Sequence, residues 1–272
     1  MTSPLVSVVI PTVSSRKKYL ERAVDSVLNQ SYGNVELVVV NEGLSATVQR
    51  NMGIDRSNGD FIAFLDDDDI WHRDKLEKQL CYMDDNPDCS ICICYSDDRR
   101  IGDGRVSRPP DYVFHSDLVR GFNLSSTSSY LVRRYALDML KARDGFYFDE
   151  SLPTGHEYDL ALRITRFHPV VTVPEVLMVQ NKSIGQISTN WNKKVRGQYC
   201  FMMKYGEEYS MLDYVKRVGL VFLFFMGNFV GDRVMLPINY MKDLSEAGFK
   251  DKDLRFRTSA AIKKLVSRGV KL

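Results

Sequence analysis

Four consecutive carboxylates, Asp66 to Asp69, follow the apolar run Phe61 to Leu65. An apolar run bounded by polar residues predicts a buried strand, which would place the carboxylates at its C-terminal edge, where open α/β sheets bind ligands. Asp66 and Asp68 are two positions apart and can face the same side of an extended backbone. Neighbouring carboxylates repel one another, and oxygen ligands suit Mg²⁺ or Mn²⁺. We therefore expect a metal site; the alternative is a solvated acidic turn that begins the next helix.

The elements that would position these carboxylates alternate between strands and helices. Apolar runs predict strands at 5–10, 35–40 and 61–65, and apolar residues at helical spacing predict helices from Tyr19 to Leu28 and from Thr47 to Asp55. This succession favours a parallel sheet with right-handed crossovers. Further strands are expected at 90–95, 125–132 and 170–179, with a bulge or edge position at Pro174, and helices at 156–167 and 191–205.

The composition is that of a globular protein. The chain has 272 residues, 44% of them apolar and 26% charged, which is enough for one large core with an appendage. Its five cysteines are odd in number, and Met1 to Pro4 leads directly into the first expected strand, so we expect a reducing, cytoplasmic environment. Cys92 and Cys94 alternate with isoleucines inside an apolar run, which favours buried thiols over zinc ligands.

The C-terminal part differs in character. From Met241 onward the chain has nine basic and four acidic residues, so this tail carries a formal charge of +5. The formal net charge of the whole chain is +2. Residues 218–231 are intensely apolar but fall short of the roughly 20 residues that span a membrane. Two interpretations stay open: a helix packed on the core, or a helix dipped into one leaflet with the basic tail on the headgroups. The second predicts a peripheral protein at the inner face of the cell membrane.

Five segments occur in an order and spacing that resemble family 2 glycosyltransferases, which have the GT-A fold. The segments are Val6–Thr12, Tyr19–Tyr32, Glu36–Val40, Arg50–Ile54 and Gly59–Asp69. The resemblance implies an α/β fold of the GT-A type, with a Rossmann-like, mostly parallel central sheet flanked by helices. We expect a GT-A domain at 1–205 and a helical, partly apolar and basic extension at 206–272.

The resemblance also implies a nucleotide-diphospho-sugar donor, with a UDP-sugar favoured. Pro11 and Thr12 would wrap the nucleobase, Glu42 would accept a hydrogen bond from it, and Arg50 would support this pocket. The family usually has two aspartates where this chain has Asn41 and Glu42.

The Asp-x-Asp element of the family corresponds to Asp66 and Asp68. Asp68 would hold Mn²⁺ or Mg²⁺ on the diphosphate, and Asp66 would reach the ribose or the metal through water. Asp67 would border the donor and, with Asp69, hold the loop. The departing nucleoside diphosphate needs such positive charge.

The general base of the family lies in a Gly-Glu-Asp-x-Asp pattern at a helix N-terminus. The matching residues are Gly155 to Asp159, so Glu157 takes the position of the base, with His156 and Asp159 as accessory residues. Alternatively, Glu157 and Asp159 only offset the helix dipole. Lys182 would neutralise phosphate charge where many members have a histidine.

These residues predict an inverting, metal-dependent glycosyltransferase of the hexosyltransferase type. Its acceptor would be a saccharide or a lipid-linked saccharide in surface polysaccharide or glycolipid assembly, and we expect no nucleic-acid partner. One alternative is a sugar nucleotidyltransferase, but residues 12–16 lack the glycines of a triphosphate-binding loop. Another is a non-catalytic nucleotide-sugar or membrane-surface binding protein, which would release no nucleoside diphosphate from a donor.

Overall fold

The fold is seen in a computed structural model that describes residues 3–99, 104–122, 124–181 and 191–210. The chain divides into two units, Met1–Arg217 and Val218–Leu272, and the described residues all belong to the first. The apolar stretch 218–231 and the basic tail lie outside the described residues. Among the described residues, no helix is long and apolar enough to cross a membrane.

In the described part of the chain, nine strands form one mixed sheet with the main order β2-β1-β3-β8-β5-β9-β4. β1 pairs in parallel with β2 and β3, and β5 pairs in parallel with β9, while β8 joins the two halves in antiparallel fashion. The short strands β6 and β7 pair with β5 and β9. The strands are β1 (Val6–Pro11), β2 (Val35–Val40), β3 (Phe61–Phe64), β4 (Ile70–Trp71), β5 (Ile91–Asp98), β6 (Arg105–Ser107), β7 (Tyr112–Val113), β8 (Leu131–Arg133) and β9 (Val170–Gln180).

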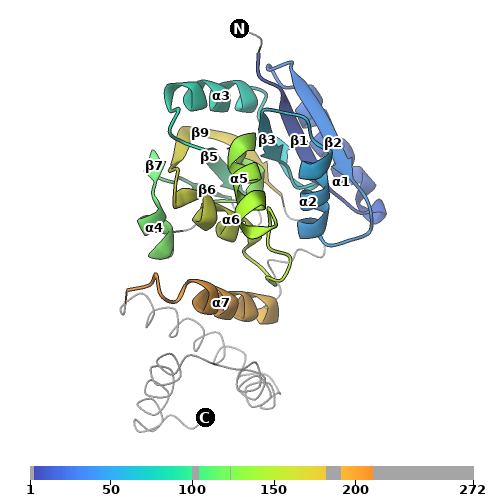
Figure 1. Cartoon of the computed structure of the whole chain (residues 1–272). Helices are drawn as coiled ribbons and strands as arrows, with labels where there is room; N and C mark the ends of the chain where they lie inside the picture. The colour runs from blue at the N-terminus through green and yellow to red at the C-terminus, as the bar shows by residue number, and fades with distance from the viewer. Residues whose placement is uncertain (1–2, 100–103, 123, 182–190, 211–272) are drawn as a thin grey trace, which may run out of the picture. The chain divides into compact units, whose positions relative to one another are not determined.

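Helices cover both faces of the sheet (Figure 1). One apolar core packs α2, α5 and α6 against the sheet, and a second packs α1 and α3 against the other face. This layering follows from strands that are apolar on both sides, since each face needs its own cover. The helices are α1 (Lys17–Leu28), α2 (Ala46–Arg56), α3 (Lys75–Asp85), α4 (His115–Val119), α5 (Arg134–Asp144), α6 (His156–Thr165) and α7 (Trp191–Tyr205), with 3₁₀ turns η1 (Ser14–Arg16) and η2 (Thr127–Ser129).

Most predicted elements are confirmed, and one is wrong. The expected irregularity at Pro174 is confirmed as a register shift, because Cys94 pairs with Val173 and the next residue of β5 pairs with Val176. The single strand expected at 125–132 is instead the turn η2 followed by the short strand β8. Serine and threonine hydroxyls bond to nearby backbone and so compete with a strand ladder. The Ser126 side chain does this by accepting from the Ser128 N–H.

Candidate functional site

The four carboxylates directly follow β3, and each is held differently. Asp67 is buried and accepts a hydrogen bond from the Thr12 hydroxyl at 2.7 Å. Arg16, at the end of η1, donates from Nε to both carboxylate oxygens of Asp67, at 2.8 and 2.9 Å. Its Nη2 also reaches Asp68, at 3.0 Å from Oδ2. The loop after β1 is thus tied to the carboxylate loop, as expected for neighbouring parallel strands.

Asp69 is buried and faces inward. The Ser128 hydroxyl donates to its Oδ2 at 2.7 Å, and the Asn181 N–H donates to its Oδ1 at 3.2 Å. Burial, followed by the negative charge of Asp66, raises the pKa of Asp69 well above its usual range, against the effect of the Ser128 bond. The same Ser128 hydroxyl accepts from the Asp66 N–H at 3.0 Å, so one serine fixes both ends of the carboxylate run.

Asp66 forms an ion pair with Arg50 of α2. The Arg50 guanidinium lies 5.8 Å from the centroid of the Phe148 ring. Next to it on α2, Asn51 donates to the Phe148 carbonyl at 3.0 Å and to Glu150 at 2.8 Å. These contacts join the carboxylate loop to the segment that leads into α6.

The N-terminus of α6 carries the predicted base. Gly155 occupies the N-cap position with a φ of 76°, in the left-handed region that favours glycine, and Glu157 lies in the first turn. The His156 Nε2–H donates to the Leu152 carbonyl at 2.8 Å, since a carbonyl oxygen can only accept. In the part of the chain that the structure describes, the half-buried Glu157 carboxylate has no hydrogen-bond or ion-pair partner.

The two halves of the site are electrostatic neighbours. Burial lowers the pKa of His156, the positive charge of Arg50 adds to this lowering, and the negative charge of Glu157 opposes it. Burial, and then the charge of Glu157, raises the pKa of Tyr130. Within the described ranges, the buried polar side-chain atoms without a hydrogen-bond partner are the Tyr130 hydroxyl and Nε of Arg50. Both belong to this region, where a bound substrate could supply partners.

Asp159, predicted as an accessory residue of the site, is bonded to residues outside it. It is fully buried and accepts hydrogen bonds from Nε of Arg163 at 2.8 Å and from the Tyr205 hydroxyl at 2.5 Å. Lys204 of α7 lies 2.6 Å from its Oδ1. Asp159 therefore ties α6 to α7. The sequence pattern could not reveal this because the partners on α7 lie more than forty positions later.

The other residues predicted for donor binding differ in their positions. Pro11 ends β1 and is buried, whereas Glu42 is exposed and pairs with Arg56 at 2.9 Å. Lys182 lies outside the described residues. Cys92 and Cys94 are buried thiols of β5, as predicted, and burial raises the pKa of Cys94 to about 11.

The residues of the carboxylate loop suit a divalent cation whose remaining coordination positions are filled by a substrate. Among the described residues, no three Asp, Glu, His or Cys side chains form a complete metal-binding cluster. Mg²⁺, however, is usually bound through one or two carboxylates and completes its coordination with water and substrate phosphates. The oxygen ligands of Asp66 and Asp68 suit such a site.

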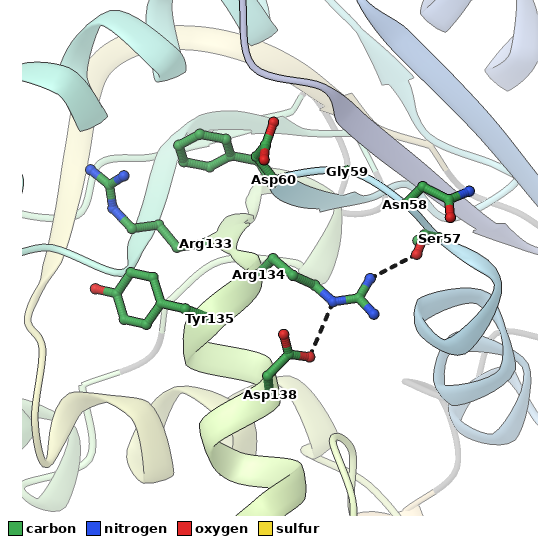
Figure 2. Close-up of a pocket in the computed structure, with 9 residues that line it drawn as sticks. Ser57, Asn58, Gly59, Asp60, Arg133, Arg134, Tyr135 and Asp138 are labelled. Atoms are coloured by element: carbon green, nitrogen blue, oxygen red, sulfur yellow. Dashed lines mark hydrogen bonds and ion pairs between the residues drawn. The ribbon is translucent and has the colours of Figure 1, made fainter.

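A surface pocket of about 640 Å³ lies at the opposite end of β3 (Figure 2). It is lined by residues that precede β3, such as Gly59 and Asp60, and by the start of α5. Figure 2 shows Arg134 between Asp138 and Ser57, and Nη1 of this arginine donates to the Ser57 carbonyl at 2.9 Å. Arg134 thus caps the C-terminus of α2. This pocket is separate from the carboxylates, which follow the other end of the strand.

A sheet of this order, with an acidic loop after β3 and the Glu157 carboxylate at the start of α6, is the arrangement expected of the GT-A fold. Residues 7–48 and 41–134 match the family described as Glycosyl transferase family 2. The chain belongs to the family 2 glycosyltransferases, as the sequence motifs predicted.

Named relatives are glycosyltransferases too. The chain is 29% identical over 172 residues to an uncharacterized glycosyltransferase of Haemophilus influenzae, a match that covers 52% of this chain and 67% of the relative. It is 36% identical over 107 residues to the putative teichuronic acid biosynthesis glycosyltransferase TuaG of Bacillus subtilis, which covers 29% of this chain and 42% of the relative. The chain thus spans between about two fifths and two thirds of the length of these relatives.

Two solved structures share the fold. S. aureus TarS 1-349 in complex with UDP-GlcNAc matches with a TM-score of 0.53 and 15% identity, over 85% of this chain and 74% of that chain. The mannosyltransferase PcManGT from Pyrobaculum calidifontis, in complex with GDP-Man and Mn²⁺, matches with a TM-score of 0.54 and 16% identity, over 97% of this chain and 88% of that chain. The predicted GT-A fold is confirmed.

Proposed function

We propose that this protein is an inverting, metal-dependent glycosyltransferase that moves a sugar from a nucleotide-diphospho-sugar to an acceptor hydroxyl. The observation that carries the proposal is the Glu157 carboxylate. It is half-buried and without a bonding partner in the described part of the chain, and its charge acts on His156, as does that of Arg50, which pairs with Asp66. A carboxylate free of other bonds beside a donor site is what a general base requires.

The donor side rests on the loops after β1 and β3. TarS is described with UDP-GlcNAc and PcManGT with GDP-Man and Mn²⁺, which supports a nucleotide-sugar donor and a divalent cation for this chain as well. A UDP-sugar is favoured. A cation held by Asp68, with Asp66 beside it, would supply positive charge to the departing diphosphate.

The protein groups then have distinct tasks. Glu157 accepts the proton of the acceptor hydroxyl while that oxygen attacks the anomeric carbon and the bond to the diphosphate breaks. One displacement inverts the configuration at that carbon. Glu157 lies in the first turn of α6, where the partial positive charge of a helix N-terminus attracts negative charge. Arg50 holds Asp66 in place through their ion pair.

The acceptor is proposed to be a saccharide or lipid-linked saccharide of surface polysaccharide assembly. The name of the Bacillus subtilis relative supports this class of product. The +5 charge from Met241 onward supports peripheral contact of residues 206–272 with anionic lipid. Co-sedimentation of the full chain with phosphatidylglycerol vesicles tests this contact, which should weaken as salt rises.

Release of nucleoside diphosphate from a panel of UDP- and GDP-sugars, with Mn²⁺ and with candidate acceptors, tests the enzymatic proposal. We expect Asp68→Asn and Glu157→Gln each to lower turnover by about 100-fold or more. The exposed carboxylates Asp25 and Glu21 of α1 provide matched controls, since Asp25→Asn and Glu21→Gln should leave turnover unchanged. A wild-type chain that binds donors but releases no diphosphate would be a binding protein instead.

A further inference from the structure

Arg16 bridges two of the four carboxylates. Its Nε lies 2.8 and 2.9 Å from the oxygens of Asp67, and its Nη2 lies 2.8 Å from Asp67 Oδ1 and 3.0 Å from Asp68 Oδ2. The Arg16 side chain is only 21% exposed, and those of Asp67 and Asp68 are 7% and 11% exposed. The guanidinium also lies 5.0 Å from the centroid of the Tyr19 ring. The Arg16 contacts are therefore largely buried, unlike those of an ion pair on the protein surface.

The two carboxylate partners of Arg16 have different roles. Asp67 is fixed a second time by the Thr12 hydroxyl, so the Arg16–Asp67 pair can persist when the loop binds a ligand. Asp68, in contrast, is the carboxylate assigned above to the divalent cation. A guanidinium on Asp68 and a divalent cation on the same carboxylate repel each other, so each weakens the binding of the other.

The negative charge of a nucleoside diphosphate changes this balance. Guanidinium groups bind phosphate oxygens as well as carboxylates, with the same planar arrangement of donors. An arginine anchored to Asp67 beside the cation could therefore turn from Asp68 to the diphosphate. The cation and the nucleotide would then support each other's binding.

We propose that Arg16 is a positioning residue that couples the cation to the nucleotide: it holds Asp68 in the free protein, opposes binding of the cation alone, and releases Asp68 when the diphosphate arrives. This inference rests on the proposed function. It assigns a role to Arg16, for which the sequence motifs predicted none.

Binding of Mn²⁺ to the full chain, measured by electron paramagnetic resonance of the free ion, tests the coupling without any turnover. Titrations are run with Mn²⁺ alone and with UDP or GDP present. We expect Arg16→Gln to bind Mn²⁺ alone about five-fold or more tightly than the wild type, and to lose a similar factor from the enhancement by nucleotide. Arg22→Gln is the control, because Arg22 is an exposed arginine of the neighbouring helix α1.

Arg16→Lys keeps the charge and provides a second variant in case Arg16→Gln does not fold. It should bind Mn²⁺ alone as weakly as the wild type. Equal Mn²⁺ affinity for Arg16→Gln and Arg22→Gln, with binding lost in Asp68→Asn, would overturn the role of Arg16 while leaving the proposed metal site intact. Absence of Mn²⁺ binding to every variant, with or without nucleotide, would overturn both.

Discussion

Lys75 offers a quantitative test of the packing behind the carboxylate loop. Its side chain on α3 is fully buried, donates to Oε1 of Gln79 at 2.7 Å, and lies 3.9 Å from the centroid of the Trp71 ring. Gln79 in turn donates to the carbonyls of Cys92 and Ser129, at 3.0 and 2.8 Å. Ser129 belongs to the turn η2 that holds Asp66 and Asp69 through Ser128. Lys75 is therefore part of the support of the site.

Burial lowers the pKa of Lys75 to about 8 from an ordinary value of 10.5, against the opposing effects of Cys94 and Cys92. Between these two values, the unfolded chain retains a proton that the folded chain has released. The free energy of unfolding therefore rises with pH across this window, by about 3 kcal/mol in all. Below pH 8 both states are protonated, and the full cost of burying the ammonium destabilises the fold.

Lys75→Met removes this titration and leaves an apolar side chain of similar length. The variant also loses the Gln79 bond and the contact with the Trp71 ring, but these losses do not depend on pH to first order. The informative quantity is the difference in free energy of unfolding between wild type and variant. It should shift in favour of the wild type by about 3 kcal/mol between pH 7 and pH 10.5.

Urea unfolding of the full chain in reducing buffer, followed by tryptophan fluorescence, measures this difference. Lys18→Met, at an exposed position of α1, should give a pH profile parallel to the wild type. Parallel profiles for wild type and Lys75→Met would refute the reasoning, because they would mean that Lys75 titrates alike in the folded and unfolded chains.

Three further predictions concern the site itself. Glu157→Gln should lose turnover by about 100-fold or more at unchanged stability. Asp159→Asn should cost about 3 kcal/mol of unfolding free energy, measured by urea titration, because the buried Arg163 loses the negative charge of its buried partner. Gly155→Ala should lower the thermal stability more than Gly145→Ala. Both glycines have a positive φ, which costs an alanine about 1–2 kcal/mol. Only at Gly155 would the added Cβ also lie 2.7 Å from a Phe201 atom. Ser128→Ala should weaken Mn²⁺ binding in the presence of nucleotide and cost about 1–3 kcal/mol of stability, because Asp69 loses its hydroxyl donor.

The first half of the chain could be predicted closely because its signals are local. The apolar runs of β1, β2 and β3 and the helical repeat of α1 fall where the sequence placed them. The carboxylates follow β3 for the same reason, since a strand that ends in polar residues puts them at the sheet edge.

The partners of the carboxylates could not be predicted because they are contacts between distant segments. Ser128 lies 59 positions from Asp69, inside a stretch expected to be a strand, and the local pattern did not indicate which distant residue its hydroxyl would contact. Arg16 lies 51 positions from Asp67, between the strand expected at 5–10 and the helix expected from Tyr19. The hydroxyl-rich composition around Ser128, which disfavours a strand ladder, was the available sequence signal for a turn there. No sequence signal indicated the contacts of Arg16.

The four consecutive carboxylates repel one another, and side chains from several different elements offset this repulsion. Arg50 of α2 pairs with Asp66, Arg16 of η1 pairs with Asp67 and Asp68, and Asp69 is bonded to Ser128 and Asn181. Asp67 and Asp69 are buried with their partners, so their negative charges or hydrogen bonds are committed to holding the loop. The side chains of Asp66 and Asp68 remain partly accessible, at 32% and 11% exposed. A cation and a diphosphate bound as proposed would contact Asp66 and Asp68, while the bonds of Asp67 and Asp69 would continue to hold the loop.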